Sequence, residues 1–189
     1  NPPLMNKLHT RLFPSKIVIS LLANLIRDRI TEDNTSWIDY QEFRESVFQD
    51  VLEISKITKS FEEKNSILRN KRISTGLPIF HEKTFEDKAE ELKNLNKIES
   101  SKERFLDQFV GPTPRSWKHG DGTIGGILND MGLVYFRKAD DGSLEITLSK
   151  LGQQFFDKEN PILDSQDFSC SISSKEKEFI LENVIPRLD

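Results

Sequence analysis

A single β-hairpin pattern within an otherwise helical sequence most strongly constrains how this chain folds. Residues 133–137 (LVYFR) are an apolar strand candidate, and after residues 140–142 (DDG) the apolar residues Leu144, Ile146 and Leu148 alternate with polar ones. An Asp-Gly pair between two such runs is a strong local signal for a tight hairpin turn. Elsewhere apolar residues recur at three- and four-residue steps, which predicts helices. The predicted fold class is therefore α+β, mostly α.

Short helices are predicted on both sides of the hairpin. Before it, residues 124–131 carry apolar side chains at helical spacing, and Gly132 suits a C-cap. After it, Ser149 is a candidate N-cap for the next helix. Further upstream, Ser100 and Glu103 form a candidate capping box for a helix that ends at the following glycine and prolines.

The order of these elements over about residues 100–160 resembles a winged-helix domain. The resemblance rests on ILNDMGLVYF (127–136) and DDGSLEITLSKLGQQFF (140–156). Winged-helix proteins often read Leu-Thr-x-x-Gly from the second wing strand into the next helix, and residues 148–152 (LSKLG) stand at that place. Ser replaces Thr, and either residue can cap a helix. The alternative is an unrelated α+β domain with one hairpin.

Residues 1–80 are predicted to form a separate, mainly helical unit. Pro14 is expected to open a helix after an irregular lead-in. Asp39 and Glu42 form a candidate capping box for a second helix, and residues 58–70 a weaker third one. Two interpretations stay open for this unit, a helical bundle and a second, degenerate winged helix.

In the second interpretation, Trp37 and Ile38 are a short strand and residues 72–80 the wing. The very polar residues 81–99 are predicted to form an exposed connecting helix. The predicted domains are thus 1–80, 81–99 and 100–189, the last being the winged helix with a C-terminal helix. That helix has its own capping pair, Ser173 and Glu176.

Composition excludes several classes of protein. The longest apolar stretch, residues 17–26, is interrupted by Ser20 and Asn24 and is too short to span a membrane. No secretory signal pattern is present, and Cys170 is the only cysteine, so a disulfide scaffold is excluded. We therefore expect a cytoplasmic protein. The net charge of −4 differs from the strongly basic balance of a non-specific nucleic-acid coat.

No catalytic, cofactor or metal site is predicted. Residues 120–125 spell G-x-G-x-x-G, but a dinucleotide site needs that motif directly after a buried strand, and residues 114–119 (PRSWKH) are not strand-like. The three histidines, His9, His81 and His119, lie far apart in sequence and outside any metal-ligand spacing. The expectation is a chain that is not itself an enzyme.

A winged helix that binds DNA usually places the helix before the wing in the major groove, with the wing near the backbone. The resemblance therefore implies that residues 123–131 read base edges and that flanking basic residues contact phosphates. This recognition helix has no Lys or Arg, while basic residues lie before it and on the wing. The predicted DNA-contacting residues are Arg115, Lys118, His119, Thr123, Asn129, Arg137 and Lys138.

The favoured prediction is a winged-helix module that binds double-stranded DNA, in transcriptional regulation or in targeting a DNA-processing protein. Its first alternative is a winged-helix protein-interaction module, because residues 81–189 are acidic, with 15 basic and 21 acidic residues. A second alternative is the DNA-recognition part of a restriction-type nuclease. A protein partner or a homodimer is also compatible with the apolar face of the C-terminal helix.

Overall fold

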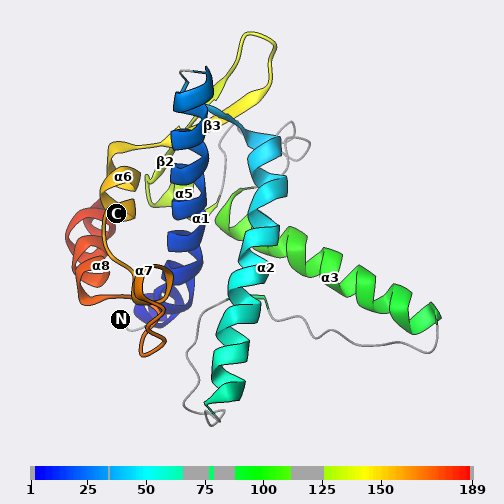
Figure 1. Cartoon of the computed structure of the whole chain (residues 1–189). Coiled ribbons are helices and arrows are strands. Elements are labelled where there is room, and N and C mark those ends of the chain that lie inside the picture. Colours follow the sequence, from blue (N-terminus) through cyan, green and yellow to red (C-terminus); the bar gives the residue numbers. More distant parts are fainter. Residues whose placement is uncertain (1–2, 34, 66–76, 79–87, 112–125, 188–189) are drawn as a thin grey trace.

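The protein is an α+β fold, mostly α, in the computed structural model, which describes residues 3–33, 35–65, 77–78, 88–111 and 126–187 (Figure 1). Three long helices, α1 (Pro3–Asp33), α2 (Tyr40–Lys64) and α3 (Lys88–Phe109), precede a β-hairpin. The shorter helices that follow the sheet lie on the side of α1 opposite to α2 and α3 (Figure 1).

Three antiparallel strands form the sheet in the order β1-β3-β2. Strands β2 (Val134–Lys138) and β3 (Leu144–Leu148) form the hairpin that the sequence predicted, with Arg137 opposite Glu145. The two-residue strand β1 (Ile38–Asp39) pairs with the other edge of β3. Of the predicted strand Trp37–Ile38, Ile38 belongs to β1, and its partner is Ile146 of the hairpin. The wing predicted at residues 72–80 lies outside the described residues, apart from residues 77–78.

Helix α1 begins at Pro3, so the predicted irregular lead-in up to residue 13 is wrong. Pro14 stands inside the helix rather than at its start. A proline in a helix interior removes one N–H donor, but it does not prevent the residues before it from being helical. The buried face of the helix includes Phe13, Ile17 and Leu22, and the core that covers it compensates the lost hydrogen bond.

Helix α2 begins as predicted and ends later than predicted. The Asp39 side chain caps it by accepting a hydrogen bond from the backbone N–H of Glu42 at 2.8 Å. The helix then continues without a break to Lys64, so the predicted separate helix from residue 58 is part of α2 in the described region. Thr58 does not cap a new helix, because its hydroxyl donates to the carbonyl of Ile54 one turn earlier.

Helix α3 joins two elements that the sequence separated. The predicted connecting helix and the helix expected to start at Ser100 are one continuous helix, and the Ser100 hydroxyl donates to the carbonyl of Asn96 within it. Glu103 does not complete a capping box but accepts a hydrogen bond from the buried Arg44 of α2 at 2.7 Å. The early part of α3 extends away from the other helices, whereas Phe105, Leu106 and Phe109 are buried (Figure 1).

The short C-terminal elements follow local signals closely. Gly132 ends α5 (Ile127–Asp130) with a positive φ of 65°, and Ser149 caps α6 (Lys150–Phe156), both as predicted. After α6 come α7 (Pro161–Ser165) and α8 (Ser174–Phe179), which continues into a π-helical turn (Ile180–Val184) and a 3-10 turn (Ile185–Arg187). The predicted capping box of Ser173 and Glu176 is present at α8.

One hydrophobic core contains residues from both the predicted first domain (1–80) and the predicted last domain (100–189). It includes Phe13 and Ile17 of α1, Val47 of α2, Ile146 of β3 and Phe155 of α6. Because β1 also completes the sheet of the hairpin, residues from 1–80 and from 100–189 share both a sheet and a core.

Candidate functional site

The described part of the predicted DNA-contacting surface lies on the hairpin and on the short helix before it. Arg137 and Lys138 are exposed at the end of β2, and Asn129 is half-buried on the short helix α5. The remaining predicted contacts fall outside the described residues. These are Arg115, Lys118, His119 and Thr123. The structure therefore places three of the seven predicted residues, and two of these are neighbours on β2 of the hairpin.

The hairpin extends beyond the neighbouring end of α1, so its turn stands clear of the helices (Figure 1). Gly142 occupies the turn with a φ of 86°, a conformation that a glycine adopts without strain. The carboxylate of Asp141 accepts a hydrogen bond from the backbone N–H of Ser143 at 2.8 Å, and hydrogen bonding to Ser143 lowers the pKa of Asp141. The hairpin thus carries a negative charge at its turn.

The two faces of the sheet differ in character because side chains alternate along each strand. The inner face consists of apolar residues such as Val134 and Ile146, which lie in the core. The strand register places Arg137 beside Glu145 and Tyr135 beside Thr147 on the outer face. Tyr135 is 60% exposed, so most of its side chain is open to solvent on this face.

Arg137 is held by two neighbours on this outer face. Its Nε lies 2.6 Å from a carboxylate oxygen of Glu145. Its guanidinium carbon lies 4.3 Å from the centre of a Trp37 ring, a cation–π contact that requires the side chain to reach across β3. Thr147 supports the start of β1, since its hydroxyl donates to the carbonyl of Ser36 at 2.6 Å. We name Trp37, Tyr135, Arg137 and Glu145 the wing face.

Sequence reasoning finds Arg137 but misses the other three members of the wing face. It assigns Trp37 to a short strand without a functional role, and it treats Tyr135 and Glu145 only as strand residues. The alternation along β2 and β3 contains the signal for Tyr135 and Glu145, because a hairpin register puts both on the face of Arg137. Trp37 cannot be found in this way, since it lies next to β1, more than 90 residues earlier in the chain.

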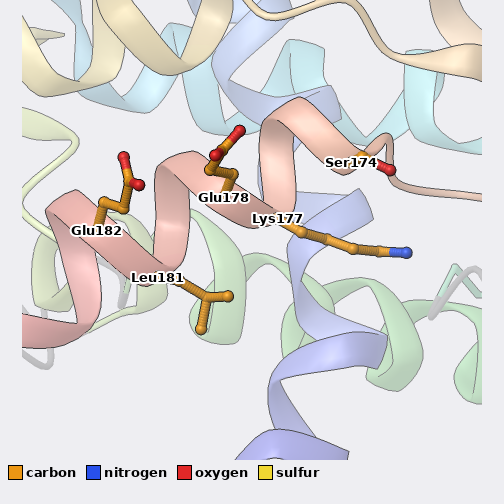
Figure 2. Close-up of a pocket in the computed structure, with 5 residues that line it drawn as sticks. All are labelled: Ser174, Lys177, Glu178, Leu181 and Glu182. Atoms are coloured by element: carbon orange, nitrogen blue, oxygen red, sulfur yellow. The ribbon is translucent and has the colours of Figure 1, made fainter.

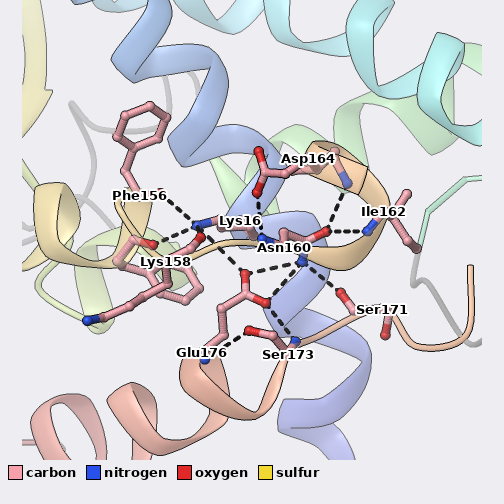
Figure 3. A network of polar contacts seen from close by, with 11 residues as sticks. Lys16, Phe156, Lys158, Asn160, Ile162, Asp164, Ser171, Ser173 and Glu176 are labelled. Atoms are coloured by element: carbon pink, nitrogen blue, oxygen red, sulfur yellow. Dashed lines mark hydrogen bonds and ion pairs between the residues drawn. The ribbon is translucent and has the colours of Figure 1, made fainter. Parts of the chain in front are cut away.

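A second polar cluster is buried between α1 and the C-terminal helices (Figure 3). The ammonium of Lys16 donates to the carbonyls of Phe155, at 2.7 Å, Phe156, at 2.9 Å, and Lys158. Its Nζ also lies 3.7 Å from the carboxylate of Glu176, and the two side chains are 2% and 0% exposed. Burial lowers the pKa of Lys16 and raises that of Glu176.

Asn160 completes this cluster and links it to α7. Its amide nitrogen donates to the carboxylate of Glu176 at 3.1 Å and to the carbonyl of Ser171 at 2.9 Å. Its side-chain oxygen accepts from the backbone N–H groups of Ile162 and Leu163. The cluster therefore holds the C-terminus of α6 and the N-termini of α7 and α8 at one point. Because its polar groups are satisfied by each other, we assign it a structural role.

A surface depression on the last helical segment offers little for binding a small molecule. Figure 2 shows its lining residues, Ser174, Lys177, Glu178, Leu181 and Glu182, all on the continuous segment formed by α8 and the π-helical turn. The two glutamates project to one side of this segment and Leu181 to the other (Figure 2). Ligand pockets are concave and lined from several elements, with convergent polar groups. This depression lacks that arrangement among its described residues.

Other kinds of site are not found in the described part of the chain. No group of three or more His, Cys, Asp or Glu side chains there is arranged to hold a metal ion. None of the helices that the structure describes is long and apolar enough to cross a membrane. The wing face is therefore the described surface with the strongest combination of charge, exposed aromatic area and fixed geometry.

Comparison with known proteins does not assign the chain to a family. No family model, no curated protein and no solved structure matches it.

Proposed function

We propose that this chain is a DNA-binding module of the winged-helix type, acting in transcriptional regulation or in targeting a DNA-processing protein. The observation that carries the proposal is the β-hairpin, which extends beyond the helices and bears Arg137 and Lys138 at the exposed end of β2 (Figure 1). A projecting hairpin with basic side chains at the end of one strand can contact DNA while the adjacent helices approach a groove.

The arrangement of strands and helices supports the same proposal. A helix, a short strand, further helices and then a hairpin follow one another along the chain, and the short strand pairs with the second strand of the hairpin. This order agrees with a winged helix whose first helix is α1 and whose first strand is β1. The winged-helix assignment would then extend over α1 and α2 rather than over residues 100–160 alone.

The charges of the wing predict weak phosphate binding. Residues 134–148 carry two basic and three acidic side chains. The charge of Arg137 is largely compensated by Glu145, which lies within hydrogen-bond distance. Lys138, the other basic residue of the hairpin, is exposed and can also approach a phosphate. Each phosphate contact changes the slope of log affinity against log salt by about one.

Fluorescence anisotropy with a random DNA duplex at several salt concentrations tests the proposal. We expect binding at low salt that weakens as salt is added. The double variant Arg137→Ala/Lys138→Ala should bind more weakly, with a salt slope reduced by about one. A matched control is Lys175→Ala/Lys177→Ala, which removes two exposed lysines from α8 and should leave binding unchanged.

The variant Glu145→Gln adds a second test, because it should raise the affinity for DNA, whereas Arg137→Ala/Lys138→Ala should lower it. The glutamine oxygen can still accept the hydrogen bond from Arg137, but the neutralising charge is gone. Affinity for the random duplex should therefore rise, and the salt slope should steepen by about one. Absence of duplex binding at low salt, or equal binding by wild type and the Arg137/Lys138 variant, would exclude the wing from DNA binding.

A protein-interaction module is the second candidate function, and the exposure of Tyr135 favours it. Tyrosine is enriched in protein interfaces, and here its ring is exposed on a sheet whose hairpin is slightly acidic. The test is affinity capture from a native lysate treated with nuclease. A stoichiometric protein that binds wild type and is lost with Tyr135→Ser supports this function, and equal recovery with both proteins contradicts it.

A further inference from the structure

We infer that Arg137 recognises the major-groove edge of a guanine, rather than a phosphate, through its two terminal nitrogens. This inference rests on the proposed DNA-binding function and names the chemical group that the wing face reads. The basis is the way in which Trp37 and Glu145 fix the guanidinium while leaving its outer edge available.

Trp37 and Glu145 contact two different parts of the Arg137 guanidinium group. Contact with a Trp37 ring, at 4.3 Å from the guanidinium carbon, holds the group against the sheet. The hydrogen bond from Nε to Glu145, at 2.6 Å, restricts rotation of the group within its own plane. A flexible arginine loses considerable side-chain entropy on binding, so an arginine that is already fixed binds its ligand at lower cost.

The terminal nitrogens of Arg137 remain available for a ligand. Among the described residues, the guanidinium makes its hydrogen bond and ion pair with Glu145 and its ring contact with Trp37, and the hydrogen bond uses Nε alone. The side chain is 47% exposed, so these nitrogens can be reached from outside. Two coplanar nitrogens with their hydrogens match a ligand that presents two neighbouring acceptors in one plane.

The compensation of the Arg137 charge by Glu145 favours one of two ligands that present paired acceptors, phosphate and guanine. Phosphate and guanine both present paired acceptors to an arginine fork. Attraction to phosphate depends on net positive charge, and Glu145 removes most of that charge at 2.6 Å from the arginine. The N7 and O6 acceptors of guanine are uncharged, and hydrogen bonds to them depend mainly on geometry. The fixed, charge-compensated arginine therefore suits guanine better.

The first experiment changes the DNA and leaves the protein intact. A duplex selected from a random pool by the wild-type protein is resynthesised with 7-deazaguanine at each guanine in turn, which removes the N7 acceptor. At one position we expect a loss of affinity that is measurable but smaller than the roughly 5- to 150-fold of a complete bidentate contact, because the O6 acceptor remains. At the other guanines the substitution should have little effect.

The second experiment uses the variant Arg137→Lys, which keeps the positive charge but lacks the planar fork. This variant should bind the unmodified duplex at least as weakly as the wild type binds the sensitive 7-deazaguanine duplex, with an unchanged salt slope, because lysine lacks the fork that holds both acceptors. It should also show no further loss with that duplex. Since Arg137 is exposed, the variant should melt at the wild-type temperature, which verifies that the fold is intact.

The outcomes separate this inference from the proposed function. If the wild type binds duplex DNA but no 7-deazaguanine substitution weakens binding, the guanine contact is refuted and DNA binding stands. A uniform loss of affinity in Arg137→Ala, with a flatter salt dependence, would identify a phosphate contact and also refute it. If no duplex binds at low salt, the proposed function fails and this inference fails with it.

Discussion

Replacing Lys16 with methionine should be among the most destabilising single changes in this protein. Methionine has a similar length but no charge and no donor. The substitution removes three hydrogen bonds from the ammonium to the carbonyls of Phe155, Phe156 and Lys158. It also leaves the carboxylate of Glu176, which is 0% exposed, without its cation.

The expected cost follows from these losses. A hydrogen bond to a charged group is worth about 1.5–3 kcal/mol, but the three cannot simply be added, because desolvating Lys16 already costs free energy in the wild type. Removing one partner of a buried ion pair typically costs about 3–5 kcal/mol. Since domains are stable by about 5–15 kcal/mol, this change should remove a large part of the free energy of unfolding.

Urea unfolding at neutral pH, followed by circular dichroism, measures this cost. The matched control is Lys177→Met, which removes an exposed lysine and should change the free energy of unfolding by less than about 0.5 kcal/mol. The double variant Lys16→Met/Glu176→Gln should be more stable than Lys16→Met, because the uncompensated carboxylate is gone. A cost below about 1 kcal/mol for Lys16→Met would show that the buried cluster does not hold α1 to the C-terminal helices.

Two further predictions concern the fold. Gly152→Ala should destabilise the protein by about 1–3 kcal/mol in thermal or urea unfolding, because the new Cβ would lie 2.0 Å from the backbone oxygen of Leu133. The comparison variant is Gly142→Ala, where the new Cβ has open space and only the φ of 86° opposes the change. If Gly152→Ala were as stable as wild type, the close approach of α6 to Leu133 would be contradicted. The raised pKa of Glu176 means that the folded wild type binds a proton more strongly than the unfolded chain above about pH 4.5. The wild type therefore loses stability as pH rises through this range. Glu176→Gln has no such group, so its stability should rise relative to that of the wild type. Unfolding curves at a series of pH values test this, and a constant difference between the two proteins would refute the raised pKa.

The local features of this fold were predictable because a few neighbouring residues determine each of them. The hairpin around residues 140–142 follows from an Asp-Gly turn between two apolar runs. Gly132, Ser149 and the Ser173–Glu176 box were predictable because caps depend on residue type at a fixed place relative to the helix.

Helix boundaries were less predictable because several residues are compatible with two structures. Pro14 suits a first helical position, but it also stands inside α1 when the surrounding residues pack into the core. Ser100 and Glu103 have the spacing of a capping box, yet α3 passes through both. There the hydrogen bond between Glu103 and Arg44 of α2 uses the side chain that the cap would have needed.

The candidate site was predictable only in part for a related reason. Arg137 and Lys138 can be recognised as basic residues on a wing. The sequence could not show that Trp37 contacts Arg137 or that Glu145 compensates its charge, because both contacts depend on strand pairing. That pairing changes the expected chemistry from a simple phosphate contact to a fixed arginine with available terminal nitrogens.

The sequence by itself determined the fold class, the hairpin and the caps of the short helices, since these depend on periodicity and on interactions within one turn. Only the tertiary structure decided that β1 joins the sheet of the hairpin and that Lys16, a residue type normally found at the surface, is buried against Glu176. The physical reason is that both depend on segments distant in the chain, which meet only when the apolar faces of α1, α2 and the sheet are buried together.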